Sequence, residues 1–429
     1  MNYFKQILYE LKNQKMVTWV SISGTALAIF LIMATFMSDR IVNVSVAPES
    51  NRHRILKGQG IDFSADNGTS GSGMGVDYEL AQKLYSNLDG VEKLSFISYL
   101  WNPFDVAQHG QKAITQKGLK VDDEFWKIYD YKFISGHPFE KTEIHSGKKL
   151  AIITESVARN VFKETDVAGQ SIDIDGEPHI IKGVIEDSFE LLPDGIIKVF
   201  VNFSKDNLTS FGEGIFGETS VRLLLKDGVS PDFVKEQVKR RYEQENRNLT
   251  KEGKELHYHQ QPYTSEELSA GSFGSNNDPN LKFHARLRAL IYVLLLLLPA
   301  INLSSMTRSR LQQRISEIGI RRAFGAKKKS IISQIFTENL ILTFIGGGIG
   351  LGLSLLFLAF LSSFFIGVVS MDFNMVTTTK ISGVIWHVFD FSTFFIAFGA
   401  CFLLNLLSIF IPAWKASEVE PAVAISKTR

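Results

Sequence analysis

Four stretches of the chain are almost continuously apolar, and polar segments separate them. A helix of about 20 apolar residues crosses a hydrocarbon core about 30 Å thick. The four stretches have about this length or more, and they occupy residues 16–38, 289–307, 334–366 and 391–414. The pattern therefore predicts an α-helical membrane protein with four transmembrane helices.

The first apolar stretch also has features of a secretory signal peptide. Lys5, Lys12 and Lys15 precede it, as basic residues do in such peptides. Its apolar run is longer than the usual core of about 7–15 residues, and no clear A-x-A cleavage site follows. We therefore expect an uncleaved membrane anchor.

Basic residues near the helix ends predict the orientation. The connection between the second and third apolar stretches, residues 308–333, holds eight basic residues against the single acid Glu317: Arg308, Arg310, Arg314, Arg321, Arg322, Lys327, Lys328 and Lys329. Cytoplasmic connections carry such an excess of Lys and Arg. We therefore expect residues 1–15, 308–333 and 415–429 in the cytoplasm, and residues 39–288 and 367–390 outside it.

The long external segment, residues 39–288, has the pattern of a large mixed α/β domain. Residues 76–85 have helical spacing of apolar positions behind Asp77, and residues 91–100 have a strand pattern. A second unit repeats this combination. It comprises a strand at 221–225, a helix that opens at Ser230 and Pro231 and runs through residue 241, and a further strand at 257–261. We expect two related α/β halves.

The region between these halves, about residues 112–203, predicts an inserted α/β module. Its strand patterns cover residues 150–154, 171–175 and 179–185, with a short helix at 156–162. Asp175 and Gly176 form a dipeptide that favours a tight hairpin turn between two of the strands.

The composition excludes several classes of function. The 46 basic and 45 acidic residues nearly balance, which argues against nucleic-acid binding. The single cysteine, Cys401, permits no intrachain disulfide and no cysteine-based zinc site. His257 and His259 share a predicted strand face without acidic partners at metal spacing, and Asp122, Asp123 and Glu124 have the pattern of a solvated helix start. We expect no catalytic residues and no metal, so a membrane-anchored external enzyme is the weaker hypothesis.

Two segments carry recognisable motifs. The tail from Ile411 to Ile425 has a closing Pro-Ala pattern. The other segment lies between two predicted membrane helices and comprises Glu317, Ile318, Gly319, Ile320, Arg321, Arg322, Ala323, Phe324, Gly325 and Ala326. Both segments resemble those of a known family, the FtsX-like permeases of ABC transporters, which include macrolide exporters and lipoprotein-release permeases.

The external segment resembles the MacB-type periplasmic domain. Five pieces match that pattern in order, and together with the two segments above they cover nearly the whole chain. The pieces are Val121–Tyr131, Gly136–Phe139, Ala151–Thr154, Gly169–Ile172 and Gly183–Val184.

The resemblance implies a permease in the inner (cytoplasmic) membrane of a bacterial cell that pairs with a second permease copy or a paralogue. It also implies that an ABC ATPase dimer binds the connection at residues 308–333. Because no G-x-x-x-x-G-K-[ST] loop occurs in the sequence, we expect ATP and Mg on a separate ATPase subunit and no cofactor on this chain. A periplasmic adaptor and a lipoprotein are candidate external partners. The alternative function is an FtsX-like signalling permease that regulates an external partner without transport.

Individual residues leave two interpretations open. A short helix could present Ile320, Ala323 or Phe324 to a groove on the ATPase, or the nearby arginines could act only as topology determinants that contact lipid headgroups. Small residues four apart allow close helix packing, either between copies or within one chain. These residues are Gly346, Gly348, Gly350 and Gly352. Glu338 is expected at the cytoplasmic start of the third helix, as an interfacial residue near the arginines rather than a functional charge within the membrane.

Overall fold

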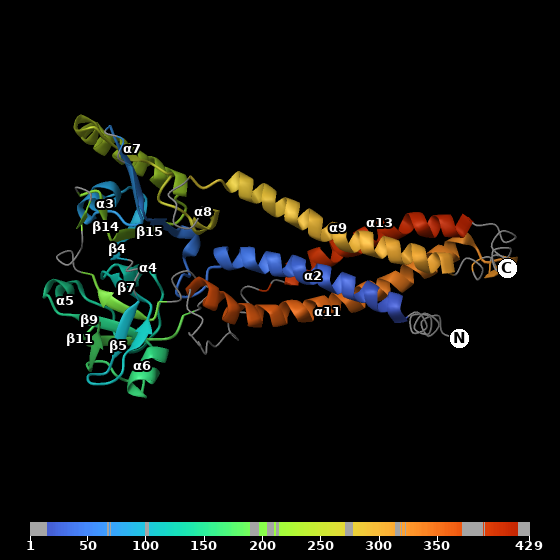
Figure 1. Cartoon of the computed structure of the whole chain (residues 1–429), viewed down its shortest axis with the longest axis horizontal. Helices are drawn as coiled ribbons and strands as arrows, with labels where there is room; N and C mark the ends of the chain where they lie inside the picture. Colours follow the sequence, from blue (N-terminus) through green and yellow to red (C-terminus); the bar gives the residue numbers. More distant parts are fainter. Residues whose placement is uncertain are drawn as a thin grey trace. The chain divides into compact units, whose positions relative to one another are not determined.

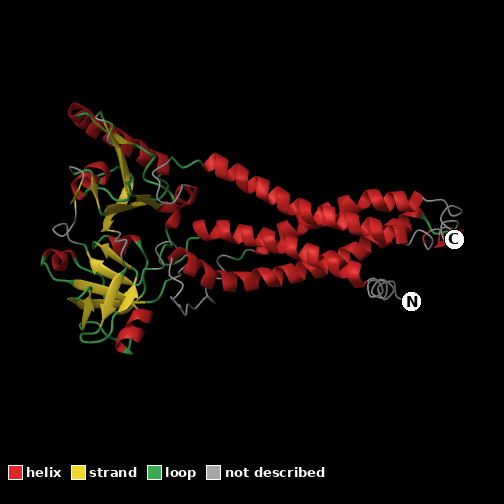
Figure 2. Ribbon diagram, in the orientation of Figure 1, coloured by secondary structure: helices red, strands yellow, loops and turns green. Residues whose placement is uncertain are grey.

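The computed structural model comprises two compact units, each with its own core. The helical unit contains Met1–Arg40, Ala285–Phe364 and Ile385–Arg429, and the α/β unit contains Ile41–His284 and Phe365–Val384. The structure describes residues 15–418 apart from 67, 69, 99–102, 189–196, 204–209, 212–213, 271–277, 314–317, 319, 322, 371–388 and 390. Figures 1 and 2 show the helices of the first unit and the strands of the second.

Each of the four apolar windows lies within one long helix. These helices are α2 (Lys15–Asn43), α9 (Leu281–Gln313), α11 (Lys328–Ser370) and α13 (Phe391–Glu418). Among the described residues, two segments are long and apolar enough to cross a membrane, Thr18–Met37 and Lys328–Phe357, and the apolar run Phe391–Ala400 is shorter. Four membrane crossings therefore remain a prediction. Helix α11 begins at Lys328, so part of the expected connection 308–333 belongs to this helix.

The α/β unit is built on one large mixed sheet. The strand order is β1-β15-β4-β7-β12-β9-β11-β10-β5-β6, and β8 pairs with β11. The pairs β7–β12 and β9–β11 are parallel, and the others are antiparallel. The strands are β1 (Ile55–Gly58), β4 (Val91–Ser98), β5 (Phe104–Ala107), β6 (Ile114–Gln116), β7 (Gly118–Val121), β8 (Phe133–Gly136), β9 (Leu150–Thr154), β10 (Ser171–Ile174), β11 (Glu177–Ile185), β12 (Val199–Asn202) and β15 (Thr219–Leu225).

Two smaller sheets and several helices complete the unit. Strands β16 (Lys254–His257), β2 (Ile61–Ala65) and β3 (Ser70–Gly73) form one sheet, and β13 (Ser210–Phe211) pairs with β14 (Phe216–Gly217). The helices are α3 (Tyr78–Tyr85), α4 (Phe125–Ile128), α5 (Lys141–His145), α6 (Glu155–Phe162), α7 (Pro231–Leu249) and α8 (Ser265–Ala270), with 3₁₀ turns η1 (Arg52–Arg54) and η3 (Thr250–Glu252).

Local signals in the sequence placed several of these elements correctly. The Asp77 side chain accepts hydrogen bonds from the first turn of α3, and Ser230 does the same for α7. Asp175 and Gly176 join β10 to β11 with φ values of 51° and 78°, the conformation that a two-residue hairpin requires.

The two predicted α/β halves and the predicted insertion share one sheet. Strands β4 and β15 are direct neighbours, and helices α3 and α7 share one hydrophobic core that includes Leu84, Leu223 and Val234. The two segments therefore build one body. The predicted insertion continues the same sheet, because β7 pairs with β4 through Ile97 and Val121. This pairing gives the β4 edge the hydrogen-bond partners that an isolated half would lack.

The strand expected at residues 257–261 is shifted towards the N-terminus. Strand β16 ends at His257. Gln260 adopts a positive φ of 56°, and Pro262 has no N–H for a ladder. His259 therefore lies beyond the strand, and the expected shared strand face with His257 does not form.

Candidate functional site

The connection between α9 and α11 contains a short helix that ends in a sharp turn. The described residues between 318 and 323 are helical. The N–H of Phe324 donates to the carbonyl of Ile320 at 3.0 Å, and the N–H of Ala326 donates to the carbonyl of Arg321 at 3.0 Å. Gly325 has a φ of +90°, which side-chain-bearing residues rarely adopt. The hydrogen bond from Ala326 to Arg321 and the positive φ of Gly325 are features of a Schellman cap. Gly325 therefore ends the helix and turns the chain towards α11.

The apolar residues of this short helix divide between a covered and an open face. Ile318 is buried, whereas Ile320 is 47% exposed and Phe324 is 89% exposed. Ile320 and Phe324 are four residues apart, so they are neighbours on the helix surface. Such an open phenylalanine favours contact with a partner or with lipid.

A chain of polar side chains connects the short helix to α11. Arg321 Nη1 donates to Gln334 Oε1 at 2.8 Å, and Gln334 Nε2 donates to Glu338 Oε1 at 3.2 Å. Glu338 is 5% exposed, so its carboxylate lies inside the helical unit. Its link to Arg321 through Gln334 fits the expected position near the arginines, and the burial of its side chain is a finding that the sequence pattern did not predict.

The structure describes most, but not all, of the predicted coupling residues. Glu317, Gly319 and Arg322 lie outside the described residues. Ala323 is exposed and Ala326 is half-buried. The basic residues that follow, Lys327, Lys328 and Lys329, are exposed as expected for a solvated or headgroup-facing segment.

The four predicted packing glycines form two pairs with different surroundings. A Cβ added at Gly346 would lie 2.9 Å from Thr25 Cβ, and one added at Gly350 would lie 2.7 Å from the carbonyl oxygen of Ala26. These two glycines therefore allow α11 to approach α2 within one chain. A Cβ at Gly348 or Gly352 would meet no atom within 4 Å. Packing of this second pair against another copy stays a prediction.

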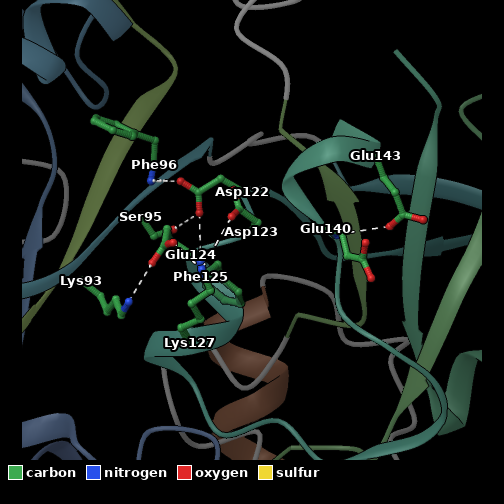
Figure 3. A network of polar contacts seen from close by, with 10 residues as sticks. All are labelled: Lys93, Ser95, Phe96, Asp122, Asp123, Glu124, Phe125, Lys127, Glu140 and Glu143. Atoms are coloured by element: carbon green, nitrogen blue, oxygen red, sulfur yellow. Dashed lines mark hydrogen bonds and ion pairs between the residues drawn. The ribbon is translucent and has the colours of Figure 1, made fainter. Parts of the chain in front are cut away.

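The acidic segment before α4 is not simply a solvated helix start. Asp122 is half-buried, and its carboxylate accepts hydrogen bonds from Ser95 Oγ at 2.7 Å, Phe96 N at 2.7 Å and Phe125 N at 3.0 Å (Figure 3). Burial raises the pKa of Asp122 to about 7 in spite of these donors. The spacing between Asp122 and Phe125 is a capping signal that could have identified this residue in the sequence.

His259 lies close to two acidic side chains. His259 Nε2 lies 3.0 Å from Asp62 Oδ2, and its Nδ1 lies 3.7 Å from Asp278 Oδ1, so His259 does have acidic neighbours. Across the described part of the chain, no group of three or more His, Cys, Asp or Glu side chains could hold a metal ion.

Comparison with protein families decides what this architecture is. Residues 18–241 match the model of the MacB-like periplasmic core domain, and residues 289–421 match the FtsX-like permease C-terminal model. The chain belongs to the MacB/FtsX-like permease family. It is an ABC transporter permease of this type, and its large mixed α/β unit is the MacB-like domain.

Individual members of the family are distant relatives. The ABC transporter permease YknZ of Bacillus subtilis is 28% identical over 236 residues, which cover 54% of this chain and 55% of that protein. The macrolide export ATP-binding/permease protein MacB 2 of Aeromonas hydrophila is 22% identical over 308 residues, 72% of this chain and 42% of the relative. The chain thus spans about half the length of these relatives.

Solved structures of permease domains also match. A domain of a permease from Porphyromonas gingivalis has 19% identity and a TM-score of 0.38, and covers 49% of this chain and 90% of that structure. The periplasmic region of MacB from Actinobacillus actinomycetemcomitans has 12% identity and a TM-score of 0.34, and covers 49% and 91%.

Proposed function

We propose that this chain is the permease subunit of an ABC transporter in a bacterial inner membrane, and that it couples ATP hydrolysis by a separate ATPase to movement of its α/β unit. One observation carries the proposal. The chain belongs to a family of ABC permeases, and its connection between α9 and α11 exposes two neighbouring apolar side chains, Ile320 and Phe324, next to exposed lysines.

The proposed topology places this pair on the side where ATP is available. Helices α2, α9, α11 and α13 would each cross the membrane, with the basic connection and both termini in the cytoplasm. The α/β unit and residues 367–390 would lie outside. The chain would pair with a second copy or a paralogue, and an external adaptor or lipoprotein would meet the α/β unit.

The proposed mechanism uses the short helix as a docking element. A groove on the ATPase would bury Phe324, whose exposed ring otherwise stays in water at a free-energy cost of about 1.5–3 kcal/mol. ATP and Mg would bind only to the ATPase. Movement of its docked surface would then pass through α9 and α11 to the α/β unit, as a mechanical transmission for export or extraction of a substrate.

Site-specific photo-cross-linking tests where the ATPase binds. A benzophenone amino acid replaces Phe324 in one variant and Phe233, an exposed phenylalanine of α7, in a matched control. Irradiation of cells should yield, from position 324 alone, an adduct with a protein that carries a nucleotide-binding P-loop, identified by mass spectrometry. The same adduct from both positions, or none from position 324, would overturn the docking proposal.

A further inference from the structure

A buried carboxylate lies about three turns into α11, where an unpaired charge would be costly. Glu338 is 5% exposed, and its neighbours Asn339, Leu342 and Thr343 are also buried. An ionised carboxylate in such a place requires hydrogen-bond donors and a compensating positive charge. Donors and a positive charge are therefore expected close to Glu338.

Gln334 supplies one donor and joins Glu338 to a cation. It lies four residues before Glu338 on the same helix, which places the two side chains next to each other. Its amide donates through Nε2 to Glu338 and accepts at Oε1 from Arg321, at 3.2 Å and 2.8 Å. An amide has both a donor end and an acceptor end, so Gln334 can bridge a carboxylate and a guanidinium.

The bridge connects two elements that lie on either side of the turn at Gly325. Arg321 belongs to the short helix that presents Phe324, whereas Gln334 and Glu338 belong to α11. Apolar burial occurs on both sides, because Ile318 on the short helix and Ile331 and Ile335 on α11 are all buried.

We propose that Arg321, Gln334 and Glu338 form a polar link that fixes the short helix to α11, so that a force on Phe324 moves α11 as one rigid body. These are positioning residues. The transmission of force depends on the proposed function above, but the fixed attachment is a property of this chain alone.

Spin-label distances measure the attachment directly. In a Cys401→Ser background, labels at Phe324→Cys and Leu353→Cys report the short helix relative to α11, because Leu353 is exposed on that helix. The 1.5 Å rise per helical residue puts the two labels about 40 Å apart. Labelled chain is diluted with unlabelled chain so that only distances within one chain are recorded.

The intact polar link should give one narrow distance distribution. Gln334→Leu keeps the size of the side chain but removes its hydrogen bonds to Arg321 and Glu338, and we expect a distribution at least about twofold wider. Thr337→Val is the matched control on the same helix, because Thr337 Oγ1 donates to the carbonyl of Ser333 within that helix, and it should keep the narrow distribution. Equal widths for wild type and Gln334→Leu would overturn the polar link.

An exchange of the two side chains separates hydrogen bonding from packing. Gln334→Glu alone places two carboxylates side by side and should broaden the distribution. Gln334→Glu combined with Glu338→Gln restores one carboxylate and one amide, and Arg321 can again be joined to both, so the narrow distribution should return. If the double variant is as broad as the single one, the proposal fails, even where Gln334→Leu does not fold.

The outcome is independent of the ATPase, because the distances are recorded on the purified permease. A narrow distribution that depends on Gln334, together with no ATPase adduct at position 324, would refute the proposed function and leave the polar link standing. The opposite pair of results would refute the polar link alone.

Discussion

Asp122 lies where two neighbouring strands separate. Strands β4 and β7 pair through Ile97–Val121 and Ser98–Lys120, and Asp122 follows directly. Its carboxylate accepts a hydrogen bond from the N–H of Phe96, which lies just outside the residue pairs of β4 and β7. It also accepts one from the N–H of Phe125, the first residue of α4. One side chain thus replaces main-chain acceptors at a junction inside the sheet, at the cost of burying a charge.

This burial predicts a pH dependence of stability. The pKa of Asp122 is raised from 3.8 to about 7, so the folded chain keeps a proton that the unfolded chain releases between these values. The proton on Asp122 therefore contributes fully to the stability of the fold below about pH 4, and this contribution is lost as the pH rises to about 7. Asp122→Asn does not titrate, and it should flatten the slope of stability against pH in this range. Urea denaturation of the full chain, followed by tryptophan fluorescence, measures this slope, and an unchanged slope in the variant would contradict the prediction.

Elements of the helical unit pack closely where glycine removes the side chain. Helices α2 and α11 meet at Gly346 and Gly350, where an added Cβ would come within 3 Å of α2 atoms. Contacts under 3 Å force the backbones apart, and overpacking of this kind costs about 1–3 kcal/mol. The positions Gly348 and Gly352, on the same helix, have no such neighbour.

The glycine pairs supply a matched test. Gly350→Ala should lower the thermal midpoint of the detergent-solubilised chain by several degrees, because its Cβ would lie 2.7 Å from the Ala26 carbonyl oxygen. Gly352→Ala changes helix propensity by the same amount and should leave the midpoint unchanged or raise it slightly. Equal losses for the two variants would show that the contact with α2 does not limit packing here.

The elements that could be predicted from the sequence are those with local signals. The caps at Asp77 and Ser230 and the Asp175–Gly176 hairpin depend on a few adjacent residues, and all three were correct. The neighbouring positions of β4 and β15 depend on pairing across more than a hundred residues, which no periodicity reveals. The sequence therefore indicated two halves and an insertion, but not that they share one sheet.

The candidate site was predictable to a similar extent. The basic connection and its glycine at position 325 were visible in the sequence. Gly325 adopts a positive φ, which glycine adopts more easily than any other residue. The bond between Arg321 and Gln334 was missed, because it joins residues on either side of that turn. Its only local signal was the four-residue spacing between Gln334 and Glu338.

At the scale of the whole molecule, the family and the site support the same account. Two family models together cover residues 18–241 and 289–421, and the connection between α9 and α11 lies inside the second. The proposed function assigns ATP hydrolysis to a separate subunit, and it places the docking of that subunit on the open face formed by Ile320 and Phe324.

Affinity purification of the full chain in mild detergent tests whether an ATPase binds at Phe324. We expect ATP hydrolysis to copurify with the wild type and with the control Phe233→Asp, and to fall at least about tenfold with Phe324→Asp, because a buried, unpaired charge would disrupt an apolar interface. All three forms should be recovered in equal amounts as monodisperse protein. Equal ATP hydrolysis with Phe324→Asp and wild type, or none with any form, would refute ATPase docking at Phe324.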